Sequence, residues 1–192
     1  MGNAGCIFIK LVDWLRPIID VKKVGQAIID HVSNTGEQIS RFACRFIPVD
    51  ILCKAGKIED FIKFATPVLA KTFPDESISD EVITWCLEFK RRNNDKVSRG
   101  EILDCVYKSI DTKRYPMQYD DAKQEVIVEV FRDMLIFSVL PLYKTLKKYN
   151  LQALSKGGDA SDDEDQERRP AIKVSDLSKQ REGGNLEKDA EE

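Results

Sequence analysis

The chain has 192 residues, of which 42% are hydrophobic and 33% are charged, and its formal net charge is −3. This length and composition are typical of one globular domain, or of one domain with a charged appendage. No stretch approaches the ~18 uninterrupted apolar residues that a membrane helix needs, so a transmembrane protein is excluded and no membrane partner is expected.

The cysteines and the histidine argue against a zinc site. The five cysteines are scattered along the chain, and none forms a Cys-x-x-Cys pair. His31 is the only histidine, so a zinc site would lack both its usual ligand spacing and its imidazoles. Scattered cysteines with apolar neighbours indicate free, buried thiols in a reducing compartment, and we therefore expect an intracellular protein without a metal.

Charge is distributed unevenly along the chain. Residues 155–192 carry 7 Lys and Arg against 12 Asp and Glu, whereas residues 1–154 carry 23 against 21. The terminal segment contains no aromatic residue, so it cannot bury enough apolar surface to offset its ordering entropy. We predict a disordered acidic tail at 155–192 behind a folded domain at 1–154. The weakly basic domain is compatible with nucleic-acid binding.

Hydrophobic periodicity predicts the elements of the first third of the chain. The apolar residues of segment 7–12 indicate an opening strand. Apolar residues recur at helical spacing over 21–32, and this helix is expected to end near Gly36. Segment 42–46 alternates as a half-buried strand does, and segment 49–53 predicts a second extended piece.

The middle of the chain predicts two helices with a strand between them. Apolar residues line one face of a helix over 57–71. Pro67 lies inside that pattern and is expected to kink the helix or to restart it. Segment 81–92 alternates as a strand with its apolar residues on one side. The sequence from Ser98 to Glu101 has the form of a capping box and predicts the start of the second helix.

The last part of the domain predicts two strands and a short helix. Segment 125–131 alternates, and segment 134–140 is almost entirely apolar, as expected for a central strand buried on both faces. A helix over 142–154 is expected to close the domain. Because helical connections of about a dozen residues favour parallel crossovers, we predict an α+β domain whose helices pack on one mixed β-sheet.

Catalytic chemistry is poorly represented in the sequence. No nucleotide-binding loop of the Gly-x-Gly-x-x-Gly or Walker type is present. His31 lies near a helix end without a nucleophile motif, so a capped or surface histidine is favoured over a catalytic base. Lys54 beside Cys53 would favour a thiolate, but such a cysteine more often belongs to the core. We therefore expect no enzyme, no catalytic residue and no cofactor.

Basic residues form a more informative pattern. Arg41 and Arg45 would share one face of their predicted strand, because side chains four residues apart on a strand point the same way. Lys90 and Arg92 would share the polar face of the next strand, while Arg91 lies at the end of its apolar face. Two predicted strands thus each present basic side chains on one side.

The segment after the second of these strands adds polar groups of a different kind. Lys96 and Arg99 flank Ser98, and the first-turn amides of the helix that Ser98 caps form a natural phosphate seat. Positive charge, amide donors and the side chains of Asn93 and Asn94 together suit an RNA backbone. The alternative is a solvated basic turn, which composition alone favours.

Several segments of the sequence resemble the THUMP domain of RNA-modifying proteins. In chain order they are 41–49, 53–55, 90–94, 97–101, 128–130, 138–139 and 148–152. The block at 41–55 and the Arg-Asn-Asn turn at 92–94 are the most specific parts, and the resemblance extends over about 5–154. The sequence is most similar to the stand-alone THUMP proteins that act as adaptors for tRNA cytidine acetylation.

The resemblance implies a fold that recognises tRNA. In that family a separate RNA cytidine acetyltransferase uses acetyl-CoA and ATP to make N4-acetylcytidine in the D-arm of serine and leucine tRNAs. The resemblance implies that this chain delivers tRNA to that enzyme in the nucleus or nucleolus, or alternatively in the cytoplasm. It assigns RNA contacts to Arg41, Arg45, Lys54, Arg92, Asn93, Asn94 and Arg99, and local charge adds Lys90, Arg91 and Lys96.

Two other functions stay open at this point. The chain could be a component of a tRNA-modifying enzyme of another type, for methylation or thiolation, because larger family members join THUMP domains to catalytic domains. It could equally be a protein-interaction module without an RNA role, in which the basic turn is merely solvated.

Overall fold

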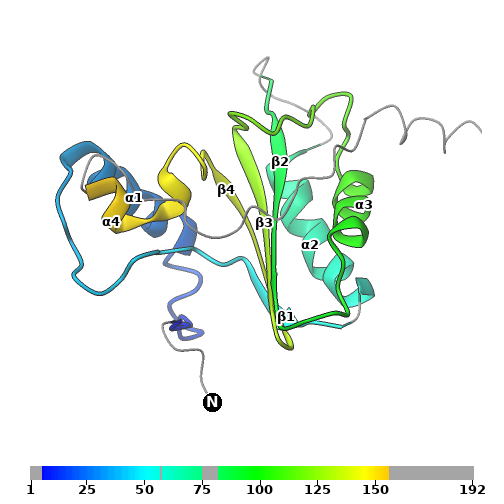
Figure 1. Cartoon of the computed structure of the whole chain (residues 1–192), viewed down its shortest axis with the longest axis horizontal. Helices are drawn as coiled ribbons and strands as arrows, with labels where there is room; N and C mark the ends of the chain where they lie inside the picture. Colours follow the sequence, from blue (N-terminus) through cyan, green and yellow to red (C-terminus); the bar gives the residue numbers. More distant parts are fainter. Residues whose placement is uncertain (1–5, 57, 75–81, 156–192) are drawn as a thin grey trace, which may run out of the picture. The chain divides into compact units, whose positions relative to one another are not determined.

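A four-stranded sheet organises the residues that this computed structural model describes, which are 6–56, 58–74 and 82–155 (Figure 1). In chain order the elements are α1 (Val21–Thr35), β1 (Ile51–Lys54), α2 (Ile58–Thr72), β2 (Trp85–Arg92), α3 (Arg99–Ser109), β3 (Gln124–Phe131), β4 (Met134–Pro141), the 3-10 helix η1 (Lys147–Tyr149) and α4 (Leu151–Ser155). The strand order across the sheet is β1-β4-β3-β2.

Strand direction makes the sheet mixed, as predicted. β2 and β3 run parallel, and β4 is antiparallel to both of its neighbours, β1 and β3. Helices α2 and α3 form the crossovers from β1 to β2 and from β2 to β3, since parallel strands cannot be joined by a tight turn. β1, β2 and β3 therefore all end, and β4 begins, at the same end of the sheet, the lower end in Figure 1.

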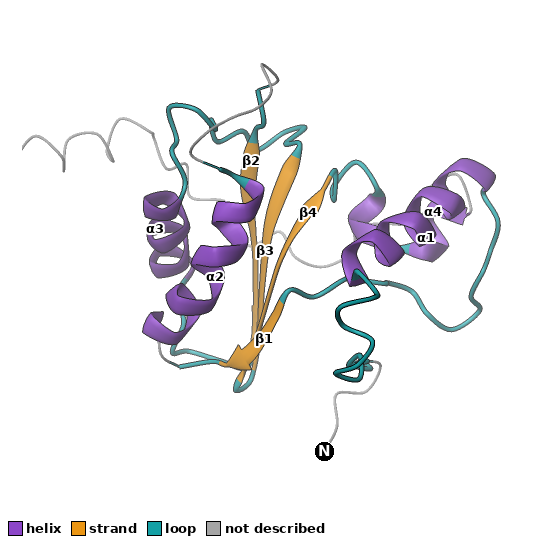
Figure 2. Cartoon of the chain, turned by 180° about the vertical axis from the view of Figure 1, so that it is seen from behind, coloured by secondary structure: helices purple, strands orange, loops and turns teal. Residues whose placement is uncertain are grey.

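Helices α2 and α3 cover one face of the sheet (Figures 1 and 2). Phe61 of α2 meets Phe137 of β4 edge to face, with ring centroids 5.5 Å apart. Val106 of α3 and Val128 of β3 are fully buried in the same apolar cluster. Fully burying a side chain of this size contributes about 1.5–3 kcal/mol, so this larger of the two apolar clusters fixes the helices on the sheet.

The opposite face is covered over only part of its length, by α1, η1 and α4 (Figure 2). Ile29 of α1 packs with Ile127 of β3 and Leu140 of β4 in a second, smaller apolar cluster. Tyr149 of η1 is buried in this cluster, and its hydroxyl donates a hydrogen bond to Oε1 of Gln26 at 2.6 Å. The rest of this face is open, which matters for the functional site.

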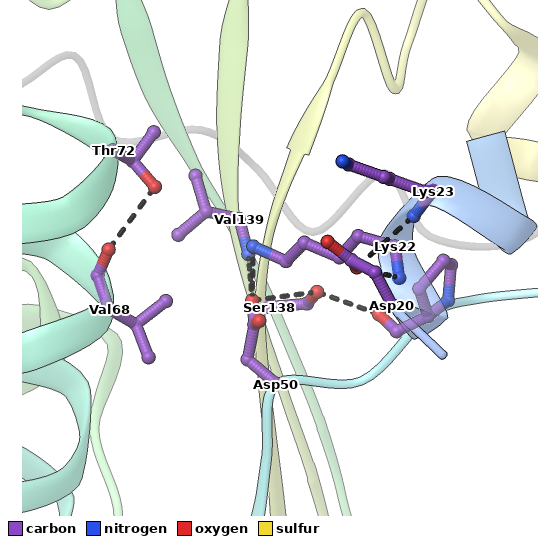
Figure 3. Close-up of polar contacts among 9 residues, drawn as sticks. Asp20, Lys22, Lys23, Asp50, Val68, Thr72, Ser138 and Val139 are labelled. Carbon is purple, nitrogen blue, oxygen red and sulfur yellow. Dashed lines mark hydrogen bonds and ion pairs between the residues drawn. The ribbon is translucent and has the colours of Figure 1, made fainter. Parts of the chain in front are cut away.

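A polar junction fixes the start of α1 to the sheet (Figure 3). Asp50, just before β1, accepts hydrogen bonds from the amide of Val139 at 3.1 Å and from the hydroxyl of Ser138 at 3.3 Å. The same carboxylate forms an ion pair with Nζ of Lys22 at 2.7 Å. Asp20 caps α1 by accepting a hydrogen bond from the amide of Lys22 at 2.9 Å. The helix start is therefore tied to two strands at once.

Gly25 lets α1 approach the segment before β1 closely. A Cβ atom at this position would collide with the ring of Pro48. A glycine in a helix costs about 1 kcal/mol relative to alanine. The close approach of the two segments accounts for a glycine in the second turn of the helix.

Two predicted strands are wrong. Segment 7–12 is not a strand, and the side chain of Ile7 is 87% exposed. Segment 42–46 makes one isolated bridge, between Arg45 and Asn150, and Phe42 is also 87% exposed. An alternating pattern is compatible with a strand, but a strand also needs partners for its amides and carbonyls. In the part of the chain that the structure describes, no strand ladder pairs with either segment.

The predicted closing helix over 142–154 is largely wrong. Turns and η1 occupy most of that range, and only Leu151–Ser155 is α-helical. Leu142 and Lys148 have φ values of 50° and 55°, which a right-handed helix does not allow. At Pro67 the expected restart does not occur, because α2 continues through that residue, while the alternative of a kink stays a prediction.

The other predicted elements are confirmed, with shifted ends. The helices α1, α2 and α3 and the strands β3 and β4 follow the predicted ranges closely. β1 is shorter than predicted, and β2 begins at Trp85 instead of at residue 81, which lies outside the described residues. The predicted tail at 155–192 also lies outside them apart from Ser155, so the domain boundary at 154 stays a prediction.

The cysteines are free, as predicted, although they are not uniformly buried. Cys86 on β2 is buried, whereas Cys6 and Cys44 are exposed. Within the described ranges no three His, Cys, Asp or Glu side chains are placed to hold a metal ion. None of the described helices has the length and apolar character of a membrane span.

Candidate nucleic-acid interface

Three loops are joined by hydrogen bonds at the end of the sheet where β1, β2 and β3 finish. The amide of Arg132, in the β3–β4 turn, donates to the carbonyl of Arg92 at 3.0 Å. Asn94, in the β2–α3 loop, donates from Nδ2 to the carbonyl of Arg132 at 2.7 Å. The amide of Ala55, after β1, donates to the carbonyl of Asp133 at 2.7 Å. Basic residues from loops far apart in the sequence are thereby fixed at one place.

Strand register places Lys54 and Arg92 on the same face of the sheet. Arg92 pairs with Phe131, Phe131 with Met134, and Met134 with Lys54. Side chains of paired residues on neighbouring strands point to the same side of a sheet. Lys54 and Arg92 therefore flank this last row from the two edge strands, and both are exposed.

Lys90 extends the basic surface by one row. It lies two residues before Arg92 on β2, so its side chain points to the same face. Partial burial lowers the pKa of Lys90 from its ordinary value, and the positive charges of Arg45 and Lys148 lower it further. Those charges act on Lys90 because the three side chains gather at this face. Lys148 is also paired with Glu88, at 3.7 Å.

Arg45 reaches this site by a different route from the one predicted. It does not lie in a strand, and its segment is held beside η1 and α4 instead. The amide of Phe46 donates to the carbonyl of Tyr149 at 3.2 Å, and the amide of Leu151 donates to the carbonyl of Cys44 at 2.8 Å. Arg45 therefore lies near the β2 cations because a loop docks there, and not because of a strand.

Asn93 and Asn94 follow Arg92 but differ in what their side chains can do. Asn93 is exposed and has a φ of 53°, in the left-handed region that asparagine tolerates well. Asn94 is only 8% exposed, and its Oδ1 accepts hydrogen bonds from the amides of Lys96 and Val97 at 2.9 and 3.0 Å. Both polar atoms of the Asn94 side chain are therefore used in shaping the loop that presents Asn93 and Lys96.

Three of the ten predicted contact residues lie apart from this group. Arg41 is exposed in the loop before Arg45, with its guanidinium 5.7 Å from the ring centroid of Phe42. Arg91 points to the other face of β2, where Nη1 donates to the carbonyl of Val97 at 3.3 Å. Arg99 is the first residue of α3, the helix that covers that other face.

The expected phosphate seat at the start of α3 already holds a carboxylate. The predicted capping box is confirmed: Ser98 Oγ accepts a hydrogen bond from the amide of Glu101 at 3.2 Å, and Glu101 Oε2 accepts one from the amide of Ser98 at 3.1 Å. The amide of Ser98 holds the pKa of Glu101 below its ordinary value. This negative charge makes the helix terminus a poorer place for a phosphate than the sequence indicated.

Three residues near the site were not singled out from the sequence. Arg132 joins it through the β3–β4 turn, Lys148 through η1, and Phe131 through the last row of the sheet. Arg132 interrupts an apolar run, and Lys148 belongs to a visible Lys-Lys pair, but neither signal says where the residue lies. Only the pairing of β3 with β2 and β4 brings Phe131 and Arg132 to the basic loops.

The candidate catalytic groups are not assembled into a reactive set. His31 is exposed and lies 3.2 Å from Glu37 through Nε2. Burial raises the pKa of the Cys53 thiol, and the charge of Asp60 raises it further, so the neighbouring Lys54 does not produce a reactive thiolate. The interpretation of Cys53 as a core residue is therefore the one that its surroundings favour.

No protein-family model matches the chain. It is 29% identical over 160 residues to the THUMP domain-containing protein 1 homolog of Drosophila melanogaster, which covers 82% of this chain and 46% of that protein. It is 27% identical over 140 residues to human THUMP domain-containing protein 1, which covers 72% of this chain and 38% of that protein. It is also 27% identical over 121 residues to tRNA acetyltransferase TAN1 of Saccharomyces cerevisiae, and this match covers 60% of this chain and 42% of that protein.

The chain thus spans less than half the length of the curated relatives that it matches. The two animal relatives carry the family name that segments 41–55 and 90–101 pointed to in the sequence. The α+β architecture with one mixed sheet agrees with the fold predicted along with that resemblance. The resemblance of this chain to THUMP domain proteins, which the sequence segments indicated, is thereby confirmed.

Proposed function

We propose that this chain is a tRNA-binding adaptor that presents its RNA to a separate modifying enzyme. In its finer form the proposal names that enzyme as an RNA cytidine acetyltransferase, which uses acetyl-CoA and ATP to form N4-acetylcytidine. The substrate site is the D-arm of serine and leucine tRNAs, and the adaptor itself needs no cofactor. Because of this partner, the proposal also locates the chain in the nucleus or nucleolus.

The observation that supports RNA binding most is the basic end of the sheet. Lys54 comes from the end of β1, and Arg92 and Lys96 come from the end of β2 and the loop after it; hydrogen bonds between loops hold these two parts of the chain together. Fixed cations of this kind neutralise phosphates and release the counterions of the RNA. The name of the yeast relative, tRNA acetyltransferase TAN1, supports the choice of tRNA and of acetylation.

The excess of positive charge on the domain is small, so affinity should be moderate and should depend strongly on salt. Residues 1–154 carry 23 Lys and Arg against 21 Asp and Glu. Each phosphate neutralised on a duplex contributes about 0.9 to the slope of log K against log salt. Three to four phosphate contacts at this end of the sheet therefore predict a slope of log K against log salt of about −3. Contacts from other surfaces would make the slope steeper.

A charge-reversal experiment tests the adaptor proposal. Lys54→Glu with Lys96→Glu changes two exposed side chains at the basic end, and binding of tRNA to the full chain is measured by fluorescence polarisation. We expect at least a tenfold loss of affinity and a shallower salt dependence. The matched control is Lys63→Glu with Lys108→Glu, which makes the same charge change on exposed positions of α2 and α3. Equal losses in both pairs would contradict the assignment.

The name of the yeast relative favours one second candidate, an acetyltransferase activity in the chain itself. The purified chain is incubated with tRNA, acetyl-CoA and ATP, and the nucleosides are analysed by mass spectrometry. If the chain is an adaptor, we expect N4-acetylcytidine to form only when the separate enzyme is added. Acetylated cytidine formed by the chain alone would reject the adaptor in favour of the enzyme. A methylated or thiolated nucleoside, with the matching donor present, would show an enzyme of another type.

A further inference from the structure

β2 is an edge strand whose outer side is only partly covered. It stands at the end of the strand order β1-β4-β3-β2 and pairs with β3 on its inner side (Figure 2). On the outer side, the amide of Trp85 donates to the carbonyl of Pro116 at 3.2 Å, and the amide of Gln118 donates to the carbonyl of Trp85 at 2.8 Å. Beyond Trp85, no described residue forms a backbone hydrogen bond with the outer side of β2.

The bonds of Trp85 identify the residues of β2 whose backbone groups point outward. Successive residues of a paired strand direct their N–H and C=O groups alternately to its two sides. Leu87, Phe89 and Arg91 therefore share the outward direction of Trp85. Leu87 is buried, whereas Phe89 is half-buried and Arg91 is exposed. Within the described residues, β2 thus has unpaired backbone donors and acceptors along an edge that opens at Phe89.

β2 lacks most of the features by which proteins protect an edge strand. Protected edges are short, interrupted by a proline or a bulge, or covered by another segment. β1, the other edge strand, has four residues, whereas β2 has eight and contains no proline. Charged side chains are a further protection, and β2 carries Glu88 and Lys90 on one face. These two charges have opposite signs, so their effect depends on what lies opposite them.

An antiparallel second copy of β2 places unlike charges opposite each other. When the two copies are centred on Phe89, Leu87 of each lies opposite Arg91 of the other, so outward groups meet outward groups. The same register places Glu88 opposite Lys90 twice, once on each side of the twofold axis. Unlike charges directly opposite each other stabilise a strand pair, and like charges destabilise it. A centre at Glu88 or at Lys90 would instead place two like charges opposite each other.

The end of β2 fits this register. Asn93 of one copy would come opposite Trp85 of the other, whose outer side segment 116–118 already occupies. The chain turns at Asn93, which has a φ of 53°, and Nδ2 of Asn94 donates to the carbonyl of Arg132 in the β3–β4 turn at 2.7 Å. Each copy therefore leaves the shared edge, toward its own β3, at the point where the edge of the other copy is occupied.

We propose that the outer edge of β2 pairs with the same edge of a second copy of the chain, antiparallel and centred on Phe89. The two four-stranded sheets then join into one continuous sheet. The opposed Glu88 and Lys90 side chains select a second copy over an unrelated strand. The paired stretch 87–91 alone buries less than the roughly 1,200–2,000 Å² of a stable complex, so the dimer is weak and depends on concentration. This inference goes beyond the proposed function and does not depend on tRNA binding.

Charge-reversed variants test both the edge and the register. Glu88→Lys places lysine opposite lysine, and Lys90→Glu places glutamate opposite glutamate. Sedimentation equilibrium of the full chain from roughly 10 μM to 1 mM measures the dissociation constant of the dimer. We expect each single variant to raise this constant about tenfold or more, because two pairs per dimer change from attractive to repulsive. An equimolar mixture of the two variants should restore the dimer, since every lysine then lies opposite a glutamate.

Matched controls are Glu59→Lys and Lys63→Glu, which make the same charge changes on exposed positions of α2. Each should dimerise as the unchanged chain does, and mixing the two should add nothing. Thermal unfolding shows whether every variant is folded. A second measurement needs no variant: amide hydrogen exchange of Phe89 in the unchanged chain should slow as the protein concentration rises, because this N–H donates across the interface.

The outcomes separate this inference from the proposed function. A chain that stays monomeric over the whole concentration range overturns the inference and leaves the adaptor proposal intact. A dimer in which exchange at Phe89 does not slow, or which both reversed variants form as well as the unchanged chain, uses another surface and overturns it too. A mixture of the reversed variants that associates no better than either alone rejects the register and with it the inference. The expected pattern in a chain that does not bind tRNA supports the inference and refutes the adaptor.

Discussion

Asn94 connects the two loops that carry most of the cations at the end of the sheet. Its amide group donates to the β3–β4 turn at Arg132, and its carbonyl oxygen accepts from the backbone of Lys96 and Val97. A side chain with all of these bonds buried is well suited to fix a loop and poorly placed to contact a ligand. We therefore treat Asn94 as a positioning residue within the proposed interface.

Asn94→Ala should weaken both the fold and tRNA binding. Removing the amide leaves three backbone groups without their partners, which should lower the free energy of unfolding by about 1–3 kcal/mol. Affinity for tRNA should fall while the salt slope changes little, because no cation is lost. Urea unfolding and polarisation titrations measure the two effects. Asn93→Gly is the control and should be nearly neutral in stability, since glycine accepts a φ of 53°. Equal destabilisation in both variants would argue against the loop clamp.

Glu125 predicts a pH dependence of stability. It is 1% exposed, its Oε1 accepts a hydrogen bond from the amide of Lys144 at 2.7 Å, and its Oε2 is without a partner among the described residues. Burial is the main cause that raises the pKa of Glu125 above its ordinary value of 4.5. The folded state therefore holds this proton more tightly than the unfolded state does. Stability that is present below pH 4.5 should be lost as the pH rises through the folded-state pKa.

Glu125→Gln tests that sign directly. The variant cannot ionise, so its free energy of unfolding should fall less than that of the unchanged chain between pH 4.5 and pH 7. Urea unfolding at several pH values in this range gives the comparison. A variant whose stability changes with pH as steeply as that of the unchanged chain would exclude Glu125 as the source.

At the scale of elements, the best-predicted parts were those with a local signal. The amphipathic spacing of α1, α2 and α3 and the alternation of β2 and β3 need no knowledge of the partner element. Segments 7–12 and 42–46 carry a similar alternation but find no strand to pair with. Pairing is a property of the whole sheet, which explains why local periodicity overestimated the number of strands.

The same limit applies to the site. Lys90 and Arg92 were correctly placed on one face from alternation alone, and the capping box at Ser98 could be read from four residues. Arg45, Lys54 and Arg132 reach the site through a docked loop, strand register and a turn. Long-range contacts of this kind leave no local pattern. Arg45 was also singled out by the spacing of basic residues, but only the resemblance to the THUMP family put Arg45 and Lys54 in one site with the residues of β2.

The packing of α1 gives a prediction at this scale. Gly25→Ala should lower the free energy of unfolding by about 1–3 kcal/mol, because the new methyl group collides with the ring of Pro48 and forces α1 away. Gly100→Ala in α3 is the matched control, since a Cβ there meets nothing within 4 Å. It should be neutral or slightly stabilising. Thermal or urea unfolding ranks the two variants, and the reverse order would contradict the close approach of α1 to the segment before β1.

At the scale of the whole molecule, the two faces of the sheet differ in how the described part of the chain covers them. Helices α2 and α3 cover one face and supply the larger apolar cluster. The other face is half covered by α1, η1 and α4, and its open half leads to the basic loops. This arrangement leaves cations and apolar side chains accessible at one end of the sheet. The proposed binding role places the RNA at that end of the sheet.

Lysine footprinting in the presence of tRNA tests this account most directly. The full chain is acetylated by a chemical reagent with and without tRNA, and modification at each lysine is read by mass spectrometry. We expect tRNA to protect Lys54, Lys90 and Lys96 strongly from chemical acetylation and to leave the acetylation of Lys63 of α2 and Lys108 of α3 unchanged. Protection confined to α2 and α3, or spread evenly over all lysines, would contradict it.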